Sequence, residues 1–157
     1  KKKQSRHLQE WRERMAREIL FKAKRLDNGE WVEGYYLLIK EKVYIILEAE
    51  TNCMDTENTD LYATEWYEVM PETVCRYIGL TDKNSNKIWE NDIVTEDFGN
   101  FKGTVRFGEF EAQVLKNIGF CIEWKDIYYR QDLAYWAEKC EVIGNIFDNP
   151  DLLEEKP

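Results

Sequence analysis

A chain of 157 residues that is 43% hydrophobic and 14% aromatic holds enough apolar material for the core of one domain, which excludes wholesale disorder. Its formal net charge of −9 disfavours a general affinity for duplex nucleic acid, because an acidic surface repels the phosphates. The most apolar run, Val43–Leu47, is too short for a membrane helix, and no secretion signal opens the chain. We therefore expect a cytoplasmic protein that does not insert into membranes.

The first 17 residues are basic, with seven Lys or Arg against two Glu, whereas the rest of the chain is strongly acidic. Ser5 can cap a helix whose apolar residues fall at spacings of three and four, namely Leu8, Trp11, Met15 and Ile19. We interpret residues 1–14 as an N-terminal extension, either helical or foreign to the native protein. Residues 15–157 then form a single β domain.

Short strands joined by turns are expected after the extension. A first strand is predicted at residues 19–24, and the Asn28-Gly29 pair that follows suits a tight hairpin turn. Aromatic and β-branched residues predict strands at 31–38 and 43–48. The charged residues Lys40-Glu41-Lys42 lie between these two strands and indicate a second hairpin.

The middle of the chain contains a predicted loop followed by two predicted strands. Residues 49–60 are polar and lack periodicity, which predicts a mobile loop. Strands are predicted again at 66–70 and 74–78. Pro71 separates them, since proline cannot donate to a β ladder and so marks a break or an edge.

Two segments have the most specific pattern, residues 77–94 (YIGLTDKNSNKIWENDIV) and residues 141–153 (EVIGNIFDNPDLL). Both resemble the signature segments of YopX-like proteins, a family carried by bacteriophages and prophages. The resemblance implies a lineage and a small SH3-like barrel, and it implies no particular reaction. Ser85 and Asn91 stand where the family usually has glycine, so we expect two locally altered turns between unchanged strands.

The remaining pattern agrees with a barrel of short antiparallel strands. Alternating apolar residues predict strands at 103–107, 110–115 and 119–124, with a turn at Gly108-Glu109 and Phe107 in the core. The fold class is therefore mainly β with minor α.

Helical structure is predicted near the end of the chain. Residues 131–139 form the best helical candidate, in which three residues can share one side: Leu133, Tyr135 and Trp136. A strand through residues 142–147 should follow. Asn149 should then cap a last turn that begins at Pro150.

The residue inventory argues against an enzyme. The only histidine, His7, lies in the extension, so the domain has no Ser-His or Cys-His nucleophile. No phosphate-cradling glycine loop is present, and the four cysteines are scattered as buried thiols would be, without metal-ligand spacing. We expect no catalytic residues, no cofactor and no metal. A magnesium-dependent nuclease remains as an alternative, built from Glu90, Asp92, Glu96 or Asp97.

An acidic stretch suggests a binding function instead. Residues 43–75 contain no Lys or Arg and eight Asp or Glu, which favours contact with a basic host or phage protein. The candidate binding residues are Glu65, Trp66, Tyr67, Glu68 and Glu72. Because neighbours in a strand point to opposite faces, at least one of the two aromatic residues should be buried.

Nucleic-acid binding by the barrel is the second hypothesis. Small barrels bind single strands through aromatic platforms and basic grooves. The candidate residues are Phe101, Lys102, Arg106, Lys116 and Lys125. Self-association into a homo-oligomer stays open, because small sheets expose edges.

Overall fold

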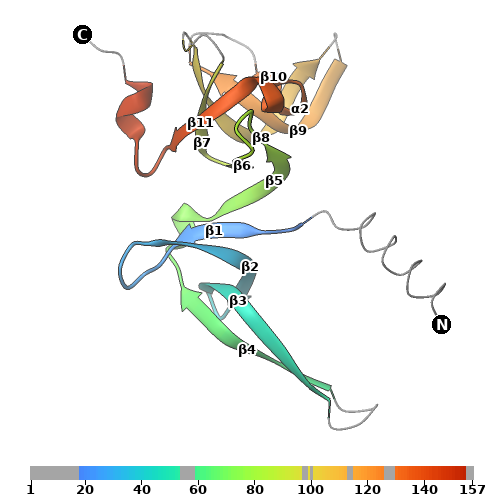
Figure 1. Cartoon of the computed structure of the whole chain (residues 1–157), viewed down its shortest axis with the longest axis vertical. Coiled ribbons are helices and arrows are strands. Elements are labelled where there is room, and N and C mark those ends of the chain that lie inside the picture. The colour runs from blue at the N-terminus through green and yellow to red at the C-terminus, as the bar shows by residue number, and fades with distance from the viewer. Residues whose placement is uncertain are drawn as a thin grey trace, which may run out of the picture.

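The fold consists of two antiparallel sheets (Figure 1). A computed structural model describes residues 18–53, 59–96, 99, 101–112, 115–125 and 130–154. In Figure 1 the five-stranded sheet lies at one end of the molecule and the β3–β4 hairpin reaches the other, with β1 and β5 between them. The predicted fold class, mainly β with antiparallel sheets and a short helix near the C-terminus, is confirmed.

The six-stranded sheet has the order β4-β3-β2-β1-β5-β6. Its strands are β1 (Phe21–Lys24), β2 (Trp31–Ile39), β3 (Lys42–Cys53), β4 (Thr59–Glu68), β5 (Cys75–Thr81) and β6 (Lys87–Trp89), with the 3-10 helix η1 (Pro71–Thr73) after β4. A bridge between Arg25 and Val69 brings the end of β4 back to the end of β1. This curvature encloses a small core of Ala23, Val43, Ile45 and Val69.

The five-stranded sheet has the order β10-β9-β8-β7-β11. Its strands are β7 (Asp92–Glu96), β8 (Lys102–Ala112), β9 (Leu115–Trp124), β10 (Arg130–Asp132) and β11 (Cys140–Asn145). Between β10 and β11 lie α2 (Leu133–Trp136) and the 3-10 helix η2 (Ala137–Lys139), and η3 (Pro150–Leu153) follows β11. β10 and β11 are the edges, so the strand ladder of the described residues is not closed. A second core lies against this sheet and includes Ile88, Val105, Ile122 and Leu133.

A buried ion pair joins the two sheets. Asp92 of β7 is 1% exposed, and its Oδ1 lies 2.8 Å from Nζ of Lys22 in β1. Its Oδ2 accepts a hydrogen bond of 2.8 Å from the backbone N–H of Trp89. The Lys22 ammonium also lies 5.2 Å and 5.3 Å from the ring centroids of Trp31 and Trp89. Burial raises the pKa of Asp92, and the Lys22 charge opposes that rise.

The two signature segments meet through Asp82, which is 4% exposed. One of its carboxylate oxygens accepts from the backbone N–H groups of Asn84 and Asn86, both at 2.9 Å. The other accepts from the N–H of Val142 in β11 at 3.0 Å. Burial opposes ionisation here, yet these hydrogen bonds outweigh it and hold the pKa of Asp82 below its ordinary value. Asp82 is therefore a structural acceptor that fixes the turn and ties it to the C-terminal strand.

Asp148 makes a further connection at the same joint. Its carboxylate accepts hydrogen bonds from Lys24 of β1 and, at 2.7 Å, from the indole N–H of Trp31 in β2. The ring of Trp31 also packs against Phe147 at 5.9 Å between centroids. We call the residues Lys22, Lys24, Trp31, Asp82, Trp89, Asp92 and Asp148 the joint.

Several predicted elements are confirmed. Strands occur close to the positions predicted for the first half of the chain, and Gly29 has the positive φ of 74° that the predicted turn needs. The 3-10 helix η1 interrupts the sheet at Pro71. Ser85 and Asn91 have φ of 66° and 69°, so both adopt the left-handed conformation that glycine favours.

Other predictions were wrong. No turn occurs at Gly108-Glu109, because β8 continues through both residues and pairs Gly108 with Gly119. A Cβ on Gly108 would lie 2.7 Å from the end of the Arg130 side chain, which is flexible and can move aside. Most of the described part of the predicted loop at 49–60 is strand, because β3 extends to Cys53 and β4 begins at Thr59, and residues 54–58 lie outside the described residues.

Individual side chains also differ from the predictions. Phe107 is 54% exposed, because β8 extends past the core and leaves this ring packed edge-on against Phe120 only. Tyr135 is 62% exposed, and the Lys139 ammonium lies over its ring. Tyr135 therefore does not share the buried side of Leu133. Asn149 precedes η3 without a side-chain cap, and its Oδ1 accepts from the N–H of Asn145 instead.

The predicted N-terminal helix lies outside the described residues. In the described part of the chain, no helix has the length and apolarity needed to cross a membrane. The thiols of Cys75, Cys121 and Cys140 are buried. Burial raises the pKa of Cys75 to about 11, which keeps this thiol protonated at neutral pH.

Candidate functional site

One face of the β2–β3–β4 arm exposes apolar side chains. The strand register places Tyr35 of β2 beside Ile46 of β3, and Ile46 beside Trp66 of β4. The same register places Leu37 beside Tyr44. We call this surface the Trp66 face and define it by Tyr35, Leu37, Ile39, Tyr44, Ile46 and Trp66.

The arm is apolar on both sides, which explains the exposure. Alternate residues of β3, Val43 and Ile45, point to the smaller core and are 5% and 0% exposed. The residues between them lie on the opposite side, where the described chain provides no second layer. Trp66 is consequently 53% exposed. An apolar patch of this kind on a folded domain typically marks a contact site.

The Trp66 face contains a shallow apolar hollow of about 240 Å³. Its lining residues are Leu37, Ile39, Tyr44, Ile46, Ala63 and Trp66. The Trp66 indole packs edge-on against the Tyr44 ring, with 5.4 Å between centroids and an interplanar angle of 81°. The hollow has room for one aliphatic or aromatic side chain of a partner.

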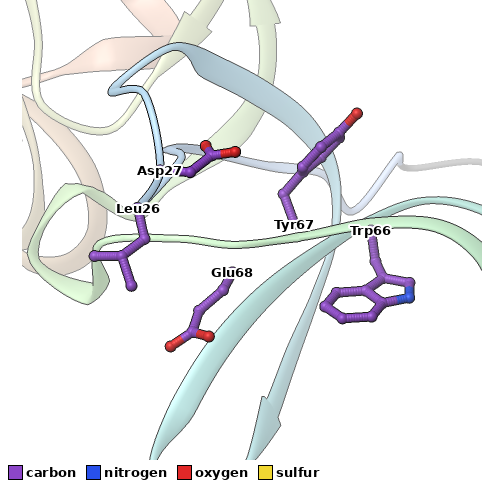
Figure 2. A pocket seen from close by; sticks show the side chains of 5 residues that line it. All are labelled: Leu26, Asp27, Trp66, Tyr67 and Glu68. Carbon is purple, nitrogen blue, oxygen red and sulfur yellow. The ribbon is translucent and has the colours of Figure 1, made fainter.

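A second hollow of about 300 Å³ lies at the end of β4 and is acidic (Figure 2). It is lined by Leu26, Asp27, Trp66, Tyr67 and Glu68. The backbone N–H of Leu26 donates to the carbonyl of Glu68 at 2.9 Å, which holds the β1–β2 turn against the end of β4. Trp66 thus lines both hollows, one apolar and one carrying two carboxylates.

Tyr67 points to the other side of β4, as Figure 2 shows. Its ring packs against the smaller core, and the Arg25 guanidinium lies 3.8 Å from its centroid. Its hydroxyl donates to Glu65 at 3.0 Å, and this hydrogen bond raises the pKa of Tyr67. The expectation that one ring of the Trp66–Tyr67 pair packs inward is confirmed, and that ring is Tyr67.

The five predicted partner-binding residues do not share one surface. Trp66 and Glu68 lie on the Trp66 side of β4, whereas Glu65 and Tyr67 lie toward the other side. Glu72 is exposed in η1. Glu68 also forms a 3.0 Å ion pair with Lys42, which raises the pKa of that lysine.

Sequence reasoning missed the apolar half of the surface. The predicted strand at 31–38 includes Tyr35 and Leu37 but not Ile39, and no face was assigned to its residues, although the run at 35–39 has no polar residue at alternate positions. A strand buried on one side and exposed to water on the other normally alternates apolar and polar residues. The missing alternation was the available signal for a second apolar face.

The nucleic-acid candidates are spread along β8 and β9. Lys102 and Lys125 lie at one end, where Lys102 Nζ donates to the carbonyl of Leu152 at 3.2 Å. Lys116 of β9 is the register partner of Glu111, which lies nine residues after Lys102 along β8. Lys116 is therefore about 30 Å from Lys102. Arg106 lies between them and is bonded to the Asn91 side chain. Phe101 is exposed, but these described residues form no continuous basic groove with it.

Two of the carboxylates considered for a magnesium-dependent nuclease form structural contacts within the fold. Asp92 is paired with Lys22, and Glu96 accepts from the N–H of Phe101 at 3.3 Å. Asp97 lies outside the described residues. In the described part of the chain, no group of three or more His, Cys, Asp or Glu is arranged to hold a metal ion, and Glu90 joins none.

Comparison with known proteins identifies the lineage. The family model described as "YopX protein" matches residues 20–154. Protein EF1440 from Enterococcus faecalis, known from a crystal structure, is similar with a TM-score of 0.54 and 21% identity. The alignment covers 87% of this chain and 98% of that one, and at this identity it supports the fold alone. No protein with curated annotation matches. The family match spans most of the chain, and the protein therefore belongs to the YopX family.

Proposed function

We propose that this protein is a non-enzymatic accessory protein of a bacteriophage or prophage, and that it binds another protein inside the host cell through the Trp66 face. The supporting observation is the position of Trp66, which is 53% exposed between an apolar and an acidic hollow. Tryptophan is among the residues that most often dominate the energy of protein interfaces. The surrounding apolar side chains would exclude water from such a contact.

Acidic residues around the arm support a basic partner. From residue 43 to residue 75 the sequence has no Lys or Arg, and Glu48, Glu50 and Glu68 lie on β3 and β4 beside the apolar face. Complementary charge at the rim of an interface raises the association rate and rejects partners of the wrong sign. The proposed contact surface therefore combines the acidic residues expected from the sequence with an apolar centre.

We further propose that the five-stranded sheet is the SH3-like part of the fold. Its support is the order β10-β9-β8-β7-β11 together with the short helices α2 and η2 before the last strand. In this proposal the SH3-like part is the scaffold, and the arm carries the contact. Lys102 of β8 and Lys116 of β9 lie at opposite ends of the β8–β9 hairpin, which disfavours nucleic-acid binding by the scaffold.

Site-specific photocrosslinking in host cells tests the binding proposal. A benzoyl-phenylalanine introduced at position 66 should form one discrete protein adduct. The matched control is the same residue at position 135, where Tyr135 is exposed on the opposite part of the molecule. It should form no such adduct.

Three other results of the crosslinking experiment would each change the proposal. An adduct at position 135 but none at position 66 would place the contact elsewhere and contradict the proposal. An adduct that nuclease treatment removes would favour nucleic-acid binding. An adduct of twice the chain mass would identify a homo-oligomer, which replaces the host or phage protein as the partner.

A further inference from the structure

β4 is an edge strand with most of its outer side uncovered. It stands first in the order β4-β3-β2-β1-β5-β6 and pairs with β3 on its inner side. Within the described residues, the contacts on the outer side lie at the end of the strand, where the N–H of Leu26 donates to the Glu68 carbonyl and Arg25 forms a β-bridge with Val69. The strand before that point, from Thr59 to about Trp66, offers backbone groups to an added strand.

This edge lacks two of the usual protections against strand addition. Natural edge strands are commonly short or carry lysine or proline. β4 has ten residues, and its sequence TDLYATEWYE contains neither. Register shifts in the β3–β4 ladder interrupt the strand beside Glu65, and the uninterrupted run Thr59–Ala63 before them is the template for another extended chain.

The charges beside the edge select which chain can add. Glu48 of β3 and Glu65 of β4 are direct partners in the register, and neither forms an ion pair within the described residues. Like charges placed opposite each other in a sheet are unfavourable. A second copy of β4 would bring more carboxylates to the edge, whereas a basic strand would neutralise those already there.

We propose that β4 accepts a basic, extended segment of the protein partner as an added strand, with a Lys or Arg side chain in the acidic hollow beside Trp66. This inference rests on the proposed function and specifies its partner. On the Trp66 side of β4 the hollow provides the Glu68 carboxylate and an indole, which together suit a cation. Glu68 already pairs with Lys42 and retains acceptor sites for another donor, whereas the Asp27 carboxylate lies on the Tyr67 side, bound to Arg25.

Amide NMR of the full chain with synthetic peptides tests the inference. The probes are a ten-residue peptide of alternating Lys and Val, the Glu-Val counterpart, and a Lys-Val peptide with proline at two central positions. The Lys-Val peptide should shift β4 amides in a saturable manner and protect them from hydrogen exchange. The Glu-Val and proline peptides should bind at least about tenfold more weakly.

Charge-neutralised variants separate this site from general acidity. Glu48→Gln/Glu65→Gln should weaken binding of the Lys-Val peptide about fivefold, while the amide oxygen introduced at position 65 can still accept from the Tyr67 hydroxyl. The matched control, Glu138→Gln/Glu154→Gln, removes the same charge from exposed residues of η2 and the end of η3. It should leave the affinity unchanged.

The outcomes distinguish the inference from the proposed function. Shifts confined to Leu37, Ile39 and Tyr44, with β4 amides unchanged, would overturn strand addition and leave the Trp66 face as a binding surface. Concentration-dependent shifts of β4 without peptide would overturn the basic partner in favour of a second copy. Equal binding of the Lys-Val and Glu-Val peptides would also overturn the inference.

Discussion

The joint and the Trp66 face contrast in how their side chains are used. In the joint, Asp82 and Asp92 are almost fully buried, and their carboxylates bond to backbone N–H groups or to Lys22. On the Trp66 face, an indole and its aliphatic neighbours are exposed beside two hollows. The contrast teaches that the signature segments of this family build the frame, and that a binding function is to be sought on the arm.

The largest expected effect tests the structural role of the joint. Asp92→Ala should lower the free energy of unfolding by about 3 to 5 kcal/mol, because Lys22 is left as a half-buried charge without its partner. The loss also leaves the Trp89 N–H without an acceptor. Denaturant unfolding measures the change.

A double variant provides the control for this prediction. Lys22→Met/Asp92→Asn removes both charges, and the Asn side chain keeps an oxygen for the Trp89 N–H. It should recover most of the loss, since replacing a buried ion pair by neutral groups costs much less than breaking it. A loss as large as that of Asp92→Ala would show that the pair is not the cause.

Substitutions on opposite faces of the arm sharpen the comparison. Ile45→Ala should cost about 3 kcal/mol, because Ile45 is fully buried in the smaller core. Trp66→Ala should cost less, about 2 kcal/mol, because the indole is already 53% exposed and loses only its remaining contacts, such as the edge-on contact with Tyr44. Thermal and denaturant unfolding of the two variants should rank them in this order. Equal losses would mean that Trp66 is a structural residue and would weaken its assignment to binding.

A turn in the first signature segment should gain stability from glycine. Ser85 has a φ of 66°, a conformation that costs a non-glycine residue about 1 kcal/mol. Ser85→Gly should raise the free energy of unfolding by up to that amount, and the backbone bond from its N–H to Asp82 is kept. Asn91→Gly is the comparison, and it should gain less because the Asn91 side chain bonds Arg106. A larger gain at position 91 would contradict this account.

The smallest expected effect is the pH dependence of stability, and its sign differs between Asp148 and Asp92 of the joint. Burial alone would raise the pKa of Asp148, but hydrogen bonds from Lys24, Asn145 and Trp31 outweigh it and lower the pKa to about 2. Its contribution to stability is therefore complete above its ordinary pKa of 3.8 and is lost as the pH falls toward 2. Asp92 behaves oppositely, because burial raises its pKa and protonation relieves the cost of the buried charge.

Carboxyl carbon NMR during an acid titration checks both directions. The Asp148 signal should titrate below 3.8 and the Asp92 signal above that value. In Asp148→Asn, the fall in stability between about pH 4 and pH 2 should become less steep. A titration of both residues at their ordinary pKa would contradict the proposed joint.

The sequence predicted local structure well where turns and strands have their own chemistry. Asn28-Gly29 and Pro71 marked real boundaries, and residues 133–139 of the predicted helix at 131–139 are helical, whereas its first two residues belong to β10. Local patterns could not show how far a hairpin continues, because that depends on cross-strand pairs such as Glu50 with Tyr62. Gly108-Glu109 was mistaken for a turn, because a glycine in the sequence does not show that β8 continues through it to pair with β9.

The candidate site was predicted only in part. Trp66 and Glu68 were correctly placed together, because both lie in one strand and two residues apart. The contribution of Leu37 and Tyr44 depends on the register between β2 and β3, which a single sequence does not fix. Leu26 and Asp27 reach the site through the curvature that joins the ends of β1 and β4, a long-range feature without a local signal.

The most direct test measures stability and partner binding on the same Trp66→Ala protein, with the partner recovered by crosslinking at position 66. We predict that the free energy of unfolding falls by no more than about 2 kcal/mol and that most partner binding is lost. Retained binding by a folded Trp66→Ala protein would contradict the claim that this face is the functional surface.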